Sequence, residues 1–167
     1  MILNAMEAVC ARSNAYMKDL YKSVEDLVIF SGIVNQDGSE NPNIAGKLSL
    51  SLYNIMSEPA GRAPDNAANA ASVFDVSLMF AAATSMSAYA EGVKLISGLL
   101  GYLQTVSVFT RANAPELSPD IGEVTLELEN LNRTELSQVM ALLDTRYAPS
   151  LFYKMRIVSS EALGAAG

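Results

Sequence analysis

The sequence predicts an α+β fold, a single domain with a mostly antiparallel or mixed sheet and helices packed on one face. Stretches that alternate apolar and polar residues, typical of half-buried strands, are interspersed with stretches whose apolar residues recur every three to four positions, typical of helices. No internal repeat is visible, and no break requires a second domain. We assign residues 1–160 to the domain and residues 161–167, rich in Ala and Gly, to a flexible C-terminal tail.

The first half of the chain predicts one helix followed by three strands. The helix covers residues 2–22, and its apolar stripe consists of Ile2, Met6, Val9, Tyr16 and Leu20. Residues 27–34 form an apolar strand, and in residues 48–56 leucines alternate with polar residues. The clearest strand covers residues 74–80. A polar loop at residues 35–43 resembles a calcium loop in composition, but the spacing of its oxygen ligands does not fit that pattern.

The second half predicts two helices and three strands. The first helix follows residue 88, and its buried stripe is expected to consist of Tyr89, Val93, Ile96, Leu100 and Leu103. A short extended segment at residues 107–110 and a strand at residues 124–128 follow. Asn132 and Glu135 form a capping-box pair at the start of the last helix. The last strand begins at Pro149 and alternates to Val158.

Residues 57–72 show no apolar period and contain Pro, Gly and repeated Asn-Ala-Ala steps. Two interpretations remain open for this segment. It is either a solvated loop that varies freely or a contact arm that becomes ordered on assembly. In the second case Arg62 and Asp65 are candidate interface residues.

Composition restricts the function classes. Half of the 167 residues are hydrophobic and only 17% are charged, which indicates either a domain rich in small residues or a surface covered by other subunits. The net charge of −7 argues against nucleic-acid binding, because an acidic chain repels phosphates. The start of the chain has no basic region before its apolar residues, and Glu91 and Lys94 interrupt the long apolar stretch, so neither a secretory signal nor membrane insertion is expected.

No residues form a recognisable catalytic, cofactor-binding or metal-binding motif. The chain has no histidine, which excludes Ser-His and Cys-His catalysis. The single cysteine, Cys10, is expected to be a buried apolar residue. Glu127 and Glu129 share one face of a strand, as a glycosidase pair could, but a solvated face or partners for basic residues is the simpler interpretation.

Two basic residues alternate along the last strand and are further interface candidates. Lys154 and Arg156 pair with Glu127 and Glu129 if the two strands are adjacent. Alternatively, they face an acidic patch on a partner. The sequence leaves both alternatives open.

The order of several segments resembles the tail-terminator (cap) proteins of phage-tail-like extracellular contractile injection systems. The segments that carry this resemblance are Tyr89-Ala90-Glu91-Gly92-Val93-Lys94, Phe109, Glu127-Leu128-Glu129-Asn130-Leu131 and Pro149-Ser150-Leu151-Phe152-Tyr153-Lys154-Met155-Arg156. Upstream, Leu50-Ser51-Leu52-Tyr53-Asn54-Ile55 is similar to an early strand of that family. No single motif is diagnostic, but their order and spacing together are specific.

The resemblance implies a structural cap without catalysis or cofactors. Such a chain assembles in the cytoplasm and forms a hexameric ring at the distal end of the tail, where it contacts the inner-tube protein and the sheath protein and ends the growth of both. An alternative is another structural component of the same machine, such as a tube or baseplate adaptor. A small enzyme with a carboxylate pair and an unrelated oligomeric binding module are alternatives from other classes.

Overall fold

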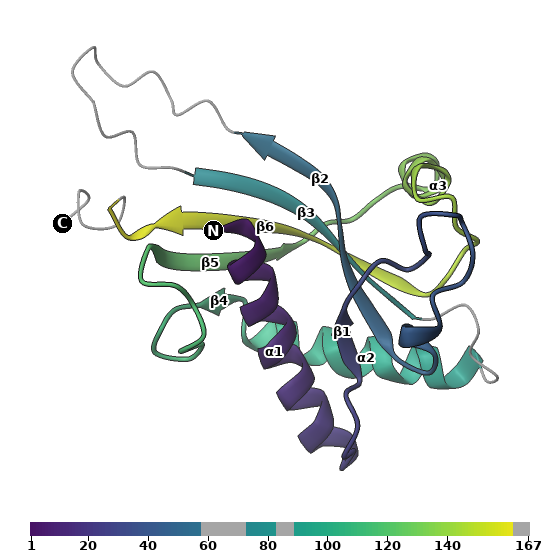
Figure 1. Cartoon of the computed structure of the whole chain (residues 1–167), viewed down its shortest axis with the longest axis horizontal. Coiled ribbons are helices and arrows are strands. Elements are labelled where there is room, and N and C mark those ends of the chain that lie inside the picture. The colour runs from purple at the N-terminus through teal and green to yellow at the C-terminus, as the bar shows by residue number, and fades with distance from the viewer. Residues whose placement is uncertain (58–72, 83–88, 162–167) are drawn as a thin grey trace.

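A computed structural model describes residues 1–57, 73–82 and 89–161 of the chain (Figure 1). The described elements follow the predicted order, and their bounds are α1 (Ile2–Tyr21), β1 (Val28–Phe30), the short 3₁₀ helix η1 (Pro42–Ile44), β2 (Leu48–Ser57), β3 (Val73–Ala82), α2 (Tyr89–Thr105), β4 (Val108–Phe109), β5 (Ile121–Leu128), α3 (Arg133–Leu142) and β6 (Ser150–Ser159). The loop at 58–72 and most of the tail, 162–167, lie outside the described residues.

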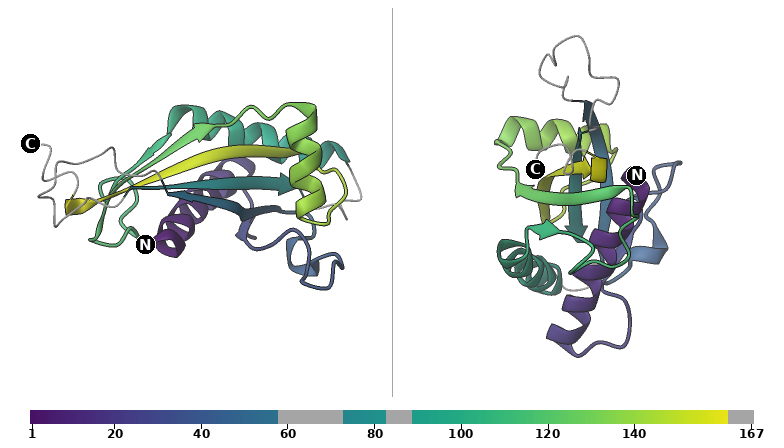
Figure 2. Two further views of the ribbon diagram at one scale, coloured as in Figure 1. Left: turned by 90° about the horizontal axis from the view of Figure 1, so that it is seen from above. Right: turned by 90° about the vertical axis from the view of Figure 1, so that its left-hand side faces the viewer.

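The strands form one mixed sheet, as predicted, with the order β1-β2-β3-β6-β5-β4 in the described part of the chain. Among the described strands, only the β1–β2 pair is parallel, and every other neighbouring pair is antiparallel. The pairing register shifts between Leu52 and Asn54 in β2 and between Ile121 and Glu123 in β5. Such irregularities increase local twist, and Figure 2 shows that the sheet is strongly twisted.

The α+β class is confirmed, but the helices do not all lie on one face of the sheet. Figure 1 shows α1 and α2 below the sheet and α3 above it. In β3, Val76, Leu78 and Phe80 belong to the core beneath α1 and α2, whereas Met79 belongs to a second core under α3. Strand side chains alternate between the two faces of the sheet, so Met79 points away from the core formed with α1 and α2. Burying it requires a second element on the opposite face. The apolar side of α3, which includes the buried Met140, provides it.

The buried face of α2 also differs from the prediction. Leu103 is buried and Ile96 packs against the core, as expected. However, Leu95, Leu99 and Tyr102 are also buried, whereas Tyr89 is 66% exposed and Val93 is 40% exposed. Apolar residues occur around most of the circumference of α2, so more than one stripe fits a helical period. Contact with α1 and the sheet selects the stripe that is buried, and periodicity alone does not contain that information.

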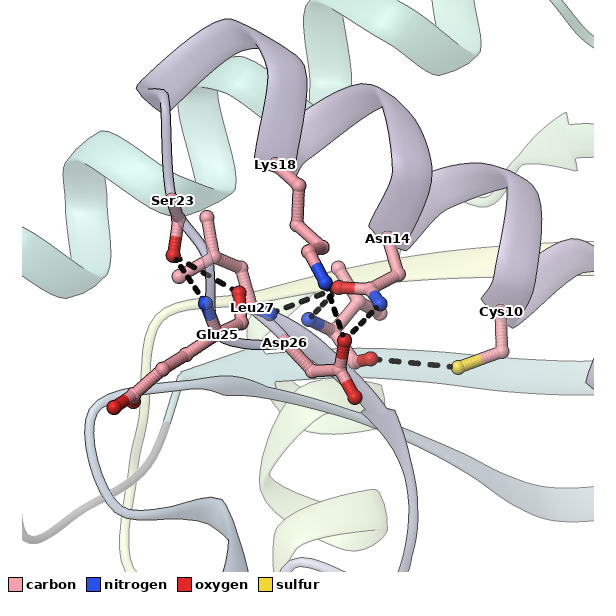
Figure 3. Close-up of polar contacts among 8 residues, drawn as sticks. Cys10, Asn14, Lys18, Ser23, Glu25, Asp26 and Leu27 are labelled. Carbon is pink, nitrogen blue, oxygen red and sulfur yellow. Dashed lines mark hydrogen bonds and ion pairs between the residues drawn. The ribbon is translucent and has the colours of Figure 1, made fainter.

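The helix α1 is attached to β1 by polar contacts (Figure 3). Asn14 accepts hydrogen bonds through Oδ1 from the backbone N–H groups of Leu27, at 2.8 Å, and Val28, at 3.1 Å. Asp26 accepts from Asn14 Nδ2 at 2.7 Å and pairs with Lys18 at 3.1 Å. These bonds satisfy backbone donors at the start of the edge strand, which would otherwise lack partners.

The strand β1 is shorter than the predicted segment 27–34. The chain leaves the sheet after Phe30, and Val34 then forms an isolated bridge with Glu40. Asn41 stabilises this departure because its side-chain amide donates to the Ser31 hydroxyl and to the Gly32 carbonyl. Ile33 and Ile44 therefore contribute to the second core under α3.

Candidate assembly surfaces

A group of polar residues, which we call the polar row, lies on the α3 side of the sheet and consists of Asp75, Lys154, Arg156 and Glu127. Asp75 on β3 and Lys154 on β6 share this face with the apolar Met79 and Phe152. The Lys154 Nζ donates to Asp75 Oδ2 at 2.7 Å. Asp75 is only 1% exposed, while the Lys154 side chain is 34% exposed. The ion pair therefore joins a buried carboxylate to a cation that reaches the surface.

The structure brings four of the six predicted interface residues to one region. β5 and β6 are adjacent, with Glu127 directly opposite Lys154 and Thr125 opposite Arg156. The two strands are therefore adjacent, which was the condition for pairing Lys154 and Arg156 with Glu127 and Glu129, and the ion pair of Lys154 is with Asp75. Arg62 and Asp65 lie outside the described residues. That these six residues contact a partner stays a prediction.

Sequence reasoning missed Asp75 as the partner of Lys154. β6 lies between β3 and β5, so Lys154 has neighbours on both sides. One feature of the sequence could have indicated this partner. Asp75 is the only carboxylate within the clearest predicted strand, residues 74–80, and it is flanked by Phe74 and Val76. A charged residue that is nearly always exposed in proteins is buried there because its partner lies on the neighbouring strand.

A groove of about 580 Å³ separates α3 from the outer part of β2. Tyr53, Asn54 and Met56 line one side, and the α3 residues Glu135, Gln138, Val139 and Leu142 line the other. The Tyr53 hydroxyl donates to Glu129 Oε2 at 2.9 Å across its floor. Burial, together with this bond to a carboxylate, raises the pKa of Tyr53 to about 12, so the hydroxyl stays protonated at neutral pH.

A smaller hollow of about 260 Å³ lies next to the groove and shares Glu129 and Leu131 with it. The charged residues that line the groove are Glu129 and Glu135, and both are acidic. The surrounding surface includes exposed apolar residues, with Met56 40% exposed and Leu142 69% exposed. The groove therefore suits a ligand or segment that combines apolar and basic groups.

The outer half of β2 has a strand neighbour on one side only. β1 pairs with β2 from Leu48 to Leu50, and no other described strand pairs with that outer side up to Ser57. Ile55 and Met56 are 51% and 40% exposed on this half. Proteins usually protect such an edge with charged residues or proline, yet residues 48–57 contain neither.

Three features of the described residues concern metal binding, thiol reactivity and membrane-spanning helices. Within residues 1–57, 73–82 and 89–161, no three acidic or cysteine side chains are grouped as metal ligands would be. Burial raises the pKa of the Cys10 thiol to about 11, so the reactive thiolate is scarce at neutral pH. A search of the same ranges for a helix long and apolar enough to cross a membrane finds none.

The fold and these surfaces define a small α+β protein. Within the described residues, its distinctive features are the unpaired outer side of β2 and the groove and hollow beside α3. A profile of the Pvc16 N-terminal domain matches residues 13–164, and the chain belongs to this family. A search of curated proteins finds no match.

Two solved structures share the fold. The first is the PVC sheath/tube terminator of an extracellular contractile injection system in its extended state, with a TM-score of 0.62 and 13% identity over 97% of this chain. The second is the tube-terminating cap of the anti-feeding prophage, with a TM-score of 0.51 and 14% identity over 92% of this chain. The chain spans 59% and 53% of the lengths of these two proteins.

Proposed function

We propose that this chain is a structural cap, or tail terminator, of a contractile injection system. In this function it forms a ring that ends the inner tube and anchors the last sheath layer. The observation that carries the proposal is membership of the Pvc16 N-terminal domain family across residues 13–164. The fold shared with a sheath/tube terminator and with a tube-terminating cap supports it.

The proposed partners are other copies of the chain in a hexameric ring, the inner-tube protein and the sheath protein. Assembly takes place in the cytoplasm, and the ring occupies the distal end of the particle. The function requires no cofactor and no catalysis, because ending a polymer needs only a surface that binds the last layer and offers no site for the next. A ring closes through heterologous contacts, in which two different surfaces of each copy meet.

The six predicted interface residues enter the proposal in two groups. Arg62 and Asp65 belong to the 57–72 segment, which we propose as a contact arm toward the tube or sheath. Glu127, Glu129, Lys154 and Arg156 lie in or beside the polar row of the sheet, which provides charges of both signs for contacts with a partner. Together with the C-terminal tail, the arm is the proposed partner-facing part of the chain.

The test is deletion of the gene in cells that produce the particles, followed by electron microscopy of tubes and sheaths. The expected result is loss of length control and detachment or overgrowth of the sheath. Particles of normal length and integrity would contradict the proposal. A second deletion, of residues 60–70 alone, tests the arm, and unchanged length and sheath attachment would remove the arm from the mechanism.

An adaptor within the tube or at the baseplate is the alternative. Labelling the chain in purified particles separates the two functions, because a cap is found only at the end distal to the baseplate. Label at the baseplate end would favour the adaptor.

A further inference from the structure

The two outer edges of the sheet end in exposed apolar residues that occupy the same row. Met56 on β2 lies opposite Asp75, and Asp75 lies opposite Arg156. The row continues through Thr125 to Val108 on β4. Met56 is 40% exposed and Val108 is 39% exposed. One row of paired residues across the sheet therefore has an exposed apolar side chain at each end.

The edge at β2 combines apolar and acidic groups. We call Leu52–Met56, with Glu129 and Glu135 in the adjacent groove, the β2 edge. Its outer side is unpaired within the described part of the chain. Glu129 binds Tyr53 through Oε2, and Glu135 caps α3 through Oε2, which leaves the second oxygen of each carboxylate for a further donor.

The edge at β4 combines an apolar residue with a free cation. We call Val108 and Arg111 the β4 edge. Arg111 is exposed, and its guanidinium has no hydrogen bond or ion pair with any other residue in the described ranges. Asn113 holds the turn that carries it, since Oδ1 accepts from the Thr110 N–H and Nδ2 donates to the Val108 carbonyl, both at 2.8 Å. This edge is therefore fixed in shape before it meets a partner.

We infer that neighbouring copies of this chain dock head to tail, with the β4 edge of one copy against the β2 edge of the next. Val108 then contacts Met56, and Arg111 faces Glu129 and Glu135. The inference rests on the proposed ring and specifies how it closes. The contact uses side chains at β4, because Asn113 already occupies the Val108 carbonyl.

Charge favours this arrangement over contact between like edges. Each copy carries a net charge of −7, so copies repel unless the contact surfaces are uncharged or complementary. Residues 48–57 and 95–110 contain no charged side chain. The charged residues that belong to the two edges are acidic at the β2 edge, Glu129 and Glu135, and basic at the β4 edge, Arg111. Two β2 edges brought together would instead oppose acidic groups.

The common row also favours a closed ring over a helical filament. Because Met56 and Val108 belong to one row, joining the two edges aligns the rows of successive copies and introduces no shift along the strands. A heterologous contact without a rise closes on itself, whereas one with a rise generates a helix.

Disulfide trapping in the purified full chain tests the contact directly. The variant with both Met56→Cys and Val108→Cys should form a ladder of cross-linked oligomers under mild oxidation. A mixture of the two single variants should form cross-linked dimers, and neither single variant alone should do so. The control pairs Met56→Cys with Val24→Cys, because Val24 is 92% exposed but lies on neither edge. Disulfide dimers of Met56→Cys alone, or no ladder from the double variant, would overturn the inference.

A charge exchange provides a second readout by oligomer mass. Met56→Lys and Val108→Glu each place a single charge in the apolar contact between Met56 and Val108, so each single change should convert rings to monomers. The combined variant places Lys against Glu at every contact and should restore the ring. Val24→Lys is the control and should leave the mass unchanged. Thermal unfolding of each variant confirms that the monomer is folded.

The outcomes separate this inference from the proposed function. Rings that persist in both single charge variants and in capped particles would refute the edge contact while the cap function stands. Particles of normal length without the chain would refute the cap function itself. Failure of the combined variant to recover the ring, with both single variants folded and monomeric, would also refute head-to-tail docking.

Discussion

Lys154 on β6 forms an ion pair with Asp75 on β3, and the carboxylate is almost completely buried, with 1% of Asp75 exposed. Its second oxygen, Oδ1, has no hydrogen-bond partner among the described residues. The charge of Asp75 therefore depends on Lys154 more than the charge of Lys154 depends on Asp75. This asymmetry leads to the first prediction.

Lys154→Met should destabilise the protein more than Asp75→Asn. Removing the lysine takes the ion-pair partner away from a buried carboxylate, which costs about 3 kcal/mol of unfolding free energy. Asp75→Asn removes the charge and leaves a lysine that reaches water, at a cost of about 1 kcal/mol. Urea unfolding measures both values. Lys22→Met, in an exposed pair with Asp19, is the control and should show no measurable change. Equal losses for the two principal variants would contradict the asymmetry.

Asn14→Ala should weaken the attachment of α1 to β1. The change removes the acceptor of the Leu27 and Val28 N–H groups, and two such bonds contribute about 2 kcal/mol. Hydrogen exchange should accelerate at these two amides more than in β3, in addition to the loss of unfolding free energy. Asn43→Ala serves as the control, since Asn43 is exposed and its side chain makes no such contact. Unchanged exchange at residues 27 and 28 would contradict this function of Asn14.

Stability should fall as the pH rises from about 9 to about 11. Burial raises the pKa of the Cys10 thiol from 9.0 to about 11, so the unfolded chain releases this proton first. The stabilisation is complete below pH 9.0 and is lost as the pH passes the folded pKa, for a total of about 3 kcal/mol. Urea unfolding across this range should show a flatter profile for Cys10→Ala. If the unfolding free energy of Cys10→Ala falls with pH as steeply as that of the original chain, the effect belongs to other groups.

The tyrosines extend this loss to higher pH. Burial raises the pKa of Tyr53 and of Tyr153 to about 12, and the bond to Glu129 contributes at Tyr53. Tyr53→Phe should remove the absorbance change of one tyrosine near pH 12 from the ultraviolet titration, because the raised pKa belongs to this side chain. A titration curve identical to that of the original chain would contradict this assignment.

Two glycines of α2 should respond to alanine in different ways. A Cβ on Gly101 meets nothing within 4 Å, so Gly101→Ala should add about 0.5–1 kcal/mol through helix propensity. A Cβ on Gly98 would lie 2.5 Å from the Tyr21 hydroxyl, which donates to the Lys94 carbonyl. Gly98→Ala must displace this ring and should be less stable than Gly101→Ala. Thermal unfolding compares the two, and equal gains would show that Tyr21 moves without cost.

Asn132→Ala should destabilise α3 by about 1 kcal/mol, the usual cost of losing an N-cap. Asn132 accepts from the N–H groups of Thr134 and Glu135, and the Glu135 carboxylate accepts from the Asn132 N–H in return. Asn132→Ser keeps an oxygen at the cap and should recover most of the loss. Chemical unfolding of both variants measures the difference, and equal losses would indicate that the cap contributes little.

Local sequence patterns determined the elements and several of their ends. The spacing of apolar residues placed α1, alternation placed β2, β3 and β6, and the Asn132–Glu135 pair fixed the start of α3. These features depend on residues a few positions apart, because helix period, strand alternation and capping are local geometric rules. The order of the segments was also sufficient to predict the family to which the chain belongs.

Contacts between distant segments decided the rest. Lys154 pairs with Asp75 because β6 lies beside β3, 79 positions earlier in the chain, and no local pattern encodes this neighbour. The side of the sheet that α3 covers and the stripe of α2 that is buried likewise depend on which apolar surfaces remain after the sheet has formed. The common row of Met56 and Val108 exists only through four successive strand pairings, so only the tertiary structure reveals it.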